Sequence, residues 1–286
     1  ALLGAAAATV ANRPGAHELL ETMLQEQKDY WIDDYGLVWD QYDEAFTEPV
    51  PVHALGTLIH TIEAYMAAAE ATTEPEWLDR AEKMTAFAYK VASKNNWRIP
   101  EYYDEEWQPS LEAGKLCNDG RRYHEGYVTG HSMQLARFAL QVRAGLRSTG
   151  WAVPDYLMEL GTELFERARV DGWRRTDGAP GFSTAVNDQG DPVPGEDEHQ
   201  QWVVCEGVCR AMLDDGHRID EVEHFEHCYR SFVDYIHDYL IAQPGRWIRR
   251  LGPHNESVQP AKSSRWDVYH AIQAMLAIRV PLWPLT

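Results

Sequence analysis

Two histidines lie at predicted helix starts, where an imidazole can exchange protons with a small substrate. His131 follows Thr129 at the start of one predicted helix, and His270 follows Asp267 at the start of another. The positive end of a helix disfavours an imidazolium, so a histidine in the first turn is held as the neutral base that can accept a proton. A surface histidine at a helix start is the ordinary alternative for both.

Three further polar residues lie on predicted helices that are otherwise apolar. His60 and Glu63 are three residues apart, so their side chains share one helical face and can form a polar pair. A core histidine with its hydrogen bonds satisfied is the alternative for His60, and spacing alone favours that alternative. Glu206 must have a partner if it is buried, because an isolated buried carboxylate is costly.

Aromatic residues are numerous, with 11 Trp and 14 Tyr residues in the chain. Several of the tryptophans, Trp202 among them, lie near predicted loops or helix ends. An aromatic face can pack against the C–H surface of a sugar ring, although most tryptophans simply fill cores. The aromatic content therefore favours a carbohydrate ligand.

The charge of the chain excludes some classes of partner. The 45 acidic and 26 basic side chains give a formal net charge of −19. Such a charge repels phosphate backbones and anionic lipids, so we expect no nucleic acid and no membrane partner. The longest apolar stretch, residues 1–11, is far shorter than the roughly 20 residues that a membrane-spanning helix needs.

Cysteines and sequence motifs give no sign of a metal or a cofactor. The 4 cysteines form neither a CxxC pair nor a disulfide framework, which favours a reducing cytoplasm. Cys205 and Cys209 lie one helical turn apart without companion ligands, so we expect buried thiols rather than metal ligands. The chain has no P-loop, no dinucleotide-binding glycine fingerprint and no HExxH motif. We therefore predict a protein without metal or cofactor.

Apolar residues recur every three or four positions, which predicts a mainly helical chain. Apolar-rich helices such as 55–69 alternate with charged ones such as 77–90, and no linker divides the chain. This pattern predicts an all-α toroid of helical hairpins that forms one domain over residues 1–286, with short extended pieces in the loops. The predicted helices cover residues 1–11, 16–32, 52–71, 75–94, 129–148, 154–170, 197–214, 221–240 and 266–277.

Several segments resemble the N-acylglucosamine 2-epimerase superfamily, and within it the isomerases that act on mannose or sulfoquinovose. The segments are residues 1–6, 42–46, 60–65, 101–107, 130–131, 202 with 206, and 267–274 ahead of 279–282. The resemblance implies an (α/α)6 barrel of twelve helices. Because nine are predicted here, we expect roughly the first three helices of the family to be absent from this sequence. The oligomeric state is left open, a homo-oligomer included.

The resemblance also implies a reaction and roles for individual residues. The reaction is metal-free proton transfer between C1 and C2 of an open-chain sugar through a cis-enediol. His131 and His270 match the acid/base pair, and His60 matches a residue that contacts the sugar and assists ring opening. The residues expected beside the substrate are His60, Glu206, Gln134, Trp202, Glu101 and Asp267. Gln134 stands where these isomerases usually carry Glu, and we predict that its amide orients His131.

Two alternatives of other classes stay open. The change to Gln134 would suit a sugar-binding or interaction protein that has lost catalysis. A glycoside hydrolase or lyase on the same kind of barrel would use carboxylates such as Asp104 and Glu206, which would then face each other across the cavity.

Overall fold

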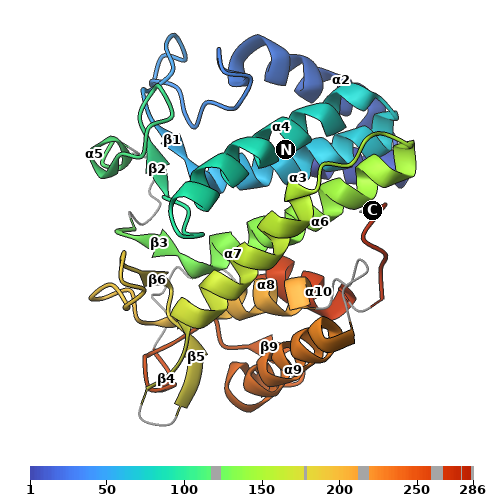
Figure 1. Cartoon of the computed structure of the whole chain (residues 1–286). Helices are drawn as coiled ribbons and strands as arrows, with labels where there is room; N and C mark the ends of the chain where they lie inside the picture. Colours follow the sequence, from blue (N-terminus) through green and yellow to red (C-terminus); the bar gives the residue numbers. More distant parts are fainter. Residues whose placement is uncertain (117–123, 177–178, 212–218, 259–266, 278, 285–286) are drawn as a thin grey trace.

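The structure, a computed structural model, describes residues 1–116, 124–176, 179–211, 219–258, 267–277 and 279–284 (Figure 1). Its helices form two layers. Consecutive inner helices pack against one another, and each of the first four also packs against the outer helix that follows it. The inner helices are α1 (Leu2–Val10), α3 (Leu55–Thr72), α6 (Thr129–Thr149), α8 (Gln201–Ala211) and α10 (Val268–Leu276), and the outer ones are α2 (Ala16–Glu26), α4 (Pro75–Lys94), α7 (Tyr156–Gly172) and α9 (Ile219–Tyr235).

The alternation of inner and outer helices agrees with the sequence pattern. Helices α3, α6 and α8 bury side chains around most of their circumference, whereas α4 buries one face and exposes the other. A helix that is buried all round must be apolar all round, and a surface helix needs only an apolar stripe. The difference in composition between neighbouring helices therefore predicts the layers.

Helix boundaries follow local signals in several places. Pro75 occupies the first turn of α4, where its missing N–H costs nothing. The side chain of Asp267 caps α10 by accepting a hydrogen bond from the backbone N–H of His270. Gly150 ends α6 in the left-handed conformation that glycine adopts without strain.

Other boundaries differ from the predicted ones. Predicted helices 16–32 and 221–240 each end in a π-helical turn, η1 (Gln27–Trp31) and η2 (Ile236–Leu240). Between α4 and α6, where no helix is predicted, lies an additional short helix, α5 (Leu111–Gly114). The predicted start at residue 266 and the predicted end over 212–214 lie outside the described residues.

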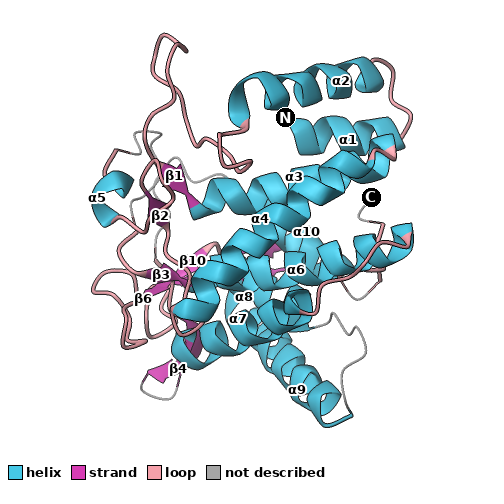
Figure 2. Cartoon of the chain, turned by 45° about the horizontal axis from the view of Figure 1, so that its top comes forward, coloured by secondary structure: helices cyan, strands magenta, loops and turns pink. Residues whose placement is uncertain are grey.

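Short antiparallel strand pairs lie beside the starts of three inner helices. Strand β1 (His53–Ala54) leads into α3 and pairs with β2 (Tyr102–Tyr103); β3 (Tyr127–Val128) leads into α6 and pairs with β6 (Ala185–Val186); β7 (His199–Gln200) leads into α8 and pairs with β10 (Arg250–Leu251). The remaining pairs are β4 (Trp173–Thr176) with β5 (Ala179–Phe182) and β8 (Ile241–Gln243) with β9 (Arg246–Trp247). In Figure 2 the labelled strands β1, β2, β3 and β6 gather on one side of the helices.

These strand pairs explain why two helices start later than predicted. The sequence predicts helices from residues 52 and 197, but residues 53–54 and 199–200 are paired in strands. Pairing with a distant strand cannot be detected from local periodicity. Its effect is to hold the first turns of α3, α6 and α8 at one edge of the helical layer.

None of the described helices combines the length and the apolar composition that crossing a membrane requires.

Candidate active site

His131 lies in the first turn of α6, and a carboxylate from a distant loop holds its ring. The Nδ1 of His131 lies 2.7 Å from Oε2 of Glu101, whose other oxygen accepts the backbone N–H of Val128 at 3.2 Å. The backbone carbonyl of Glu101 accepts a hydrogen bond from Leu55, so the start of α3 fixes this residue. An ionised carboxylate only accepts hydrogen bonds, so the proton of a neutral His131 lies on Nδ1 and the Nε2 lone pair is free for chemistry.

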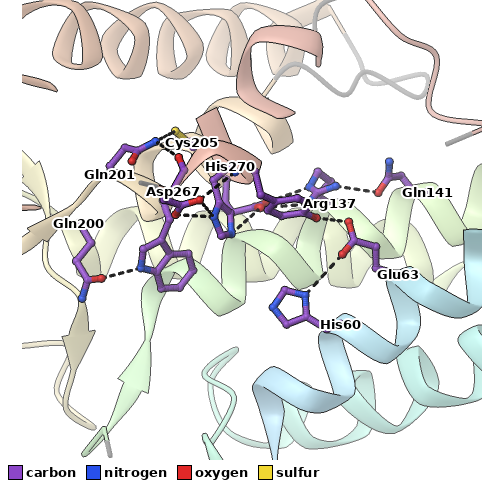
Figure 3. A network of polar contacts seen from close by, with 12 residues as sticks. His60, Glu63, Arg137, Gln141, Gln200, Gln201, Cys205, Asp267 and His270 are labelled. Atoms are coloured by element: carbon purple, nitrogen blue, oxygen red, sulfur yellow. Dashed lines mark hydrogen bonds and ion pairs between the residues drawn. The ribbon is translucent and has the colours of Figure 1, made fainter. Parts of the chain in front are cut away.

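His270 has an equivalent arrangement at the start of α10. Its Nδ1 lies 2.8 and 2.9 Å from the two oxygens of Asp267, which also caps the helix (Figure 3). Burial opposes ionisation of this carboxyl group, but its hydrogen bonds with His270 outweigh burial and hold the pKa of Asp267 below its usual value. The Nε2 of a neutral His270 is therefore the atom that can accept a proton.

The carboxylates of Glu101 and Asp267 add an influence on the histidine rings that the helix starts alone do not provide. The helix start disfavours a protonated ring, whereas an adjacent carboxylate favours it. His131 and His270 each experience both influences. A group in that balance is suited both to take a proton and to return it.

The indole of Trp202 lies close to both histidines. Its ring centroid is 5.3 Å from that of His131 and 5.6 Å from that of His270. The indole N–H donates to Gln200 at 2.9 Å, which fixes the ring plane. Gly130 leaves room for the ring, because a Cβ there would lie 2.3 Å from an indole carbon. The predicted residues His131, His270 and Trp202 thus come together from three inner helices.

Glu206 is buried on α8, as predicted, and it has the partner that burial requires. The partner is Arg137 of α6, which donates from Nε at 2.9 Å and from Nη2 at 3.1 Å (Figure 3). Oε1 of Glu206 also lies 3.7 Å from Nε2 of His270. Sequence analysis did not select Arg137, although an arginine between apolar residues of a helix that is buried on most sides is itself a signal.

His60 and Glu63 form the polar pair that the sequence left open. Nδ1 of His60 lies 3.6 Å from Oε2 of Glu63, and the hydroxyl of Tyr269 donates to the other oxygen. The side chain of His60 is 55% exposed, so the alternative of a core histidine is wrong. In Figure 3 a dashed line joins its ring to the carboxylate of Glu63. Tyr269, which is not among the predicted site residues, thereby joins α10 to α3.

Gln134 has different surroundings from those predicted. It is buried on α6, its side-chain nitrogen has no hydrogen-bond partner, and it makes no hydrogen bond to His131, both of which lie in the described part of the chain. Helical spacing predicted this contact, but Glu101 holds the ring instead, because β2 brings it to the start of α6. A contact between Gln134 and substrate stays a prediction.

Cys205, Cys209 and Asp104 have structural surroundings that account for them without a catalytic role. Cys205 and Cys209 are free and buried as predicted, and burial raises the pKa of Cys209 to about 12. Cys117 lies outside the described residues. Over the described ranges, no group of three or more His, Cys, Asp or Glu side chains is arranged to hold a metal. The carboxylate of Asp104 accepts backbone N–H groups of its own turn at 2.8 and 3.1 Å.

Comparison with known sequences identifies relatives along almost the whole chain. The profile of the N-acylglucosamine 2-epimerase (GlcNAc 2-epimerase) family matches residues 1–274. The chain is 33% identical over 294 residues to the D-mannose isomerase of Thermobifida fusca. The aligned region covers 99% of this chain and 68% of that protein. It is 31% identical over 288 residues to the D-mannose isomerase of Pseudomonas cannabina pv. alisalensis, with coverage of 99% and 68%.

Solved structures give the same result for the fold. A crystal structure of D-mannose isomerase superposes with a TM-score of 0.83 at 21% identity, over 97% of this chain and 69% of that chain. The cellobiose 2-epimerase of Spirochaeta thermophila superposes with a TM-score of 0.75 at 15% identity, over 97% and 68%. Both relatives are (α/α)6 barrels, which confirms the predicted fold class. On the extent of the sequence match and the shared fold, this chain belongs to the N-acylglucosamine 2-epimerase family.

Proposed function

We propose that this chain is a sugar isomerase or epimerase that interconverts mannose-like monosaccharides by proton transfer through a cis-enediol. His131 and His270 are the acid/base pair, one removing a proton at C1 or C2 and the other returning it. His60 contacts the sugar and assists ring opening, and Glu206 and Trp202 contact the open chain. The family and the D-mannose isomerase relatives support the class of reaction.

One observation carries the assignment of the histidines. Two imidazoles from different inner helices flank one indole, and each has its Nδ1 bound to a carboxylate. Both Nε2 atoms can therefore exchange protons with a substrate that packs against Trp202. Isomerisation through a planar enediol needs one group that removes a proton from one carbon and a second group that delivers a proton to the neighbouring carbon.

The hydrolase alternative finds less support in the geometry. It needs Asp104 and Glu206 to face each other across a cavity with a water or a glycosidic bond between them. Asp104 caps its own loop turn, and Glu206 is neutralised by Arg137 beside His270. The histidines, rather than two free carboxylates, line the shared site.

Proton NMR in heavy water tests the proposal. The purified chain is incubated with mannose, glucose or fructose, and the product ketose or aldose and the loss of the C2 proton signal are followed. We expect interconversion with deuterium incorporation in the wild type and none in His131→Ala or His270→Ala. His237→Ala is the control, because His237 is an exposed histidine that also pairs with an aspartate, and it should keep full exchange.

Two outcomes would count against the proposal. Binding of a sugar without any exchange would support the alternative of a protein that has lost catalysis. Full exchange in His131→Ala or His270→Ala, with circular dichroism unchanged, would assign the proton transfer to other groups.

A further inference from the structure

Arg137 of α6 is a buried cation that is bound to the neighbouring inner helix α8. It binds Glu206 of α8 through two hydrogen bonds and donates from Nη1 to Gln141 at 3.3 Å. Attraction to Glu206 and, more weakly, to Glu63 of α3 outweighs the burial of the guanidinium and raises its pKa well above the usual value. Arg137 is therefore permanently charged.

The same oxygen of Glu206 faces both Arg137 and His270. Oε1 accepts from Nη2 of Arg137 at 3.1 Å and lies 3.7 Å from Nε2 of His270. Because Nδ1 of a neutral His270 donates to Asp267, Nε2 carries the lone pair and lies near this oxygen. At 3.7 Å the charge of the carboxylate favours a protonated ring unless a positive charge beside the carboxylate offsets it.

We infer that Arg137 is a positioning residue that offsets the charge of Glu206 beside His270, so that Nε2 of His270 stays unprotonated and can accept a proton from substrate. Without the guanidinium, the uncompensated carboxylate of Glu206 stabilises a protonated His270 ring. A proton on Nε2 occupies the lone pair that the substrate proton needs. The catalytic consequence rests on the proposed function, whereas the proton uptake does not.

The neutral and acidic groups around Glu206 and His270 do not offset the charge of Glu206 as Arg137 does. Burial raises the pKa of the Tyr269 hydroxyl, and the thiol of Cys209 has a pKa of about 12, so both are neutral near pH 7. The carboxylates Asp267 and Glu63 add negative charge, which strengthens the attraction for a proton. Among the described residues, the titratable and charged groups near the pair are Asp267 and Tyr269 of α10, Glu63 of α3, Arg137 of α6, Cys205 and Cys209 of α8, Arg249 near Asp267, and His131 on the other inner helix that contacts Trp202.

An NMR titration of the His270 Cε1–H signal tests the inference without any turnover. In Arg137→Gln the amide keeps a hydrogen-bond donor for Glu206 and removes the charge, so the midpoint should rise by about 1 to 3 pH units above that of the wild type. Arg137→Lys keeps the charge and should titrate close to the wild type. The double variant Arg137→Met/Glu206→Met removes the carboxylate as well and should also return toward the wild-type midpoint.

Arg98→Met is the matched control, since it breaks another buried arginine–carboxylate pair, Arg98–Asp171 at 2.8 Å. It should leave the His270 midpoint unchanged. An unshifted midpoint in Arg137→Gln, or the same shift in Arg98→Met, would overturn the inference. If Arg137→Gln does not fold, a His270 midpoint raised above that of the wild type in Arg137→Lys or in the double variant would overturn the inference. Failure to isomerise any sugar would refute the proposed function and leave this result standing.

Discussion

The hydrogen bond between Glu101 and His131 gives a quantitative prediction for Glu101→Gln. Glu101 is 4% exposed and uses both oxygens, one for Nδ1 of His131 and one for the backbone N–H of Val128. Glutamine has a single oxygen, so one of the two donors must then face an NH2 group. We therefore expect both a weaker hold on the ring and a modest loss of stability, about 1 to 3 kcal/mol for one unsatisfied buried group.

The effect on rate follows from the charge that is lost. A hydrogen bond to a charged group contributes about 1.5 to 3 kcal/mol and a neutral one about 1 kcal/mol, so the protonated His131 loses about 0.5 to 2 kcal/mol of stabilisation. At about 1.4 kcal/mol per tenfold change, kcat should fall about 2- to 30-fold.

Deuterium exchange at saturating sugar measures this change, with urea unfolding as the check on folding. Glu105→Gln, which removes an exposed carboxylate from the same loop, is the control and should keep the wild-type rate. The reasoning is refuted if Glu101→Gln turns over as fast as the wild type while His131→Ala is inactive. The carboxylate would then have no part in proton transfer.

Three further predictions concern other parts of the site. The pKa of Asp267 is held below its usual value, so its ionised form stabilises the fold above the unfolded pKa of about 4. This stability is lost as pH falls through the lower folded pKa. In urea unfolding, Asp267→Asn should therefore show a smaller loss of stability than the wild type between about pH 5 and about pH 2. Gln134→Glu should lower both the melting temperature and the exchange rate, because it buries a second carboxylate while Glu101 already holds His131; a faster variant would restore the sequence-based role of Gln134. Chelation with EDTA should leave turnover unchanged, and loss of activity that manganese or zinc restores would contradict metal-free proton transfer.

The sequence by itself determined the helices, their layers and the two histidines of the candidate pair. All nine predicted helices are present, because apolar periodicity and caps such as Pro75 act within a few residues of where they occur. Placement of His131 and His270 in first turns needed the same local signals. The family resemblance then supplied the reaction that joins them.

Only the tertiary structure decided which charged groups touch. Glu101 reaches His131 across 30 residues, Arg137 reaches Glu206 across 69, and Tyr269 reaches Glu63 across 206. Periodicity gives the face on which a residue lies, but not the rotation and register of one helix against another. Those depend on the strand pairs at the helix starts and on packing between the inner helices. For that reason the sequence placed Gln134 beside His131, whereas the fold brought Glu101 there.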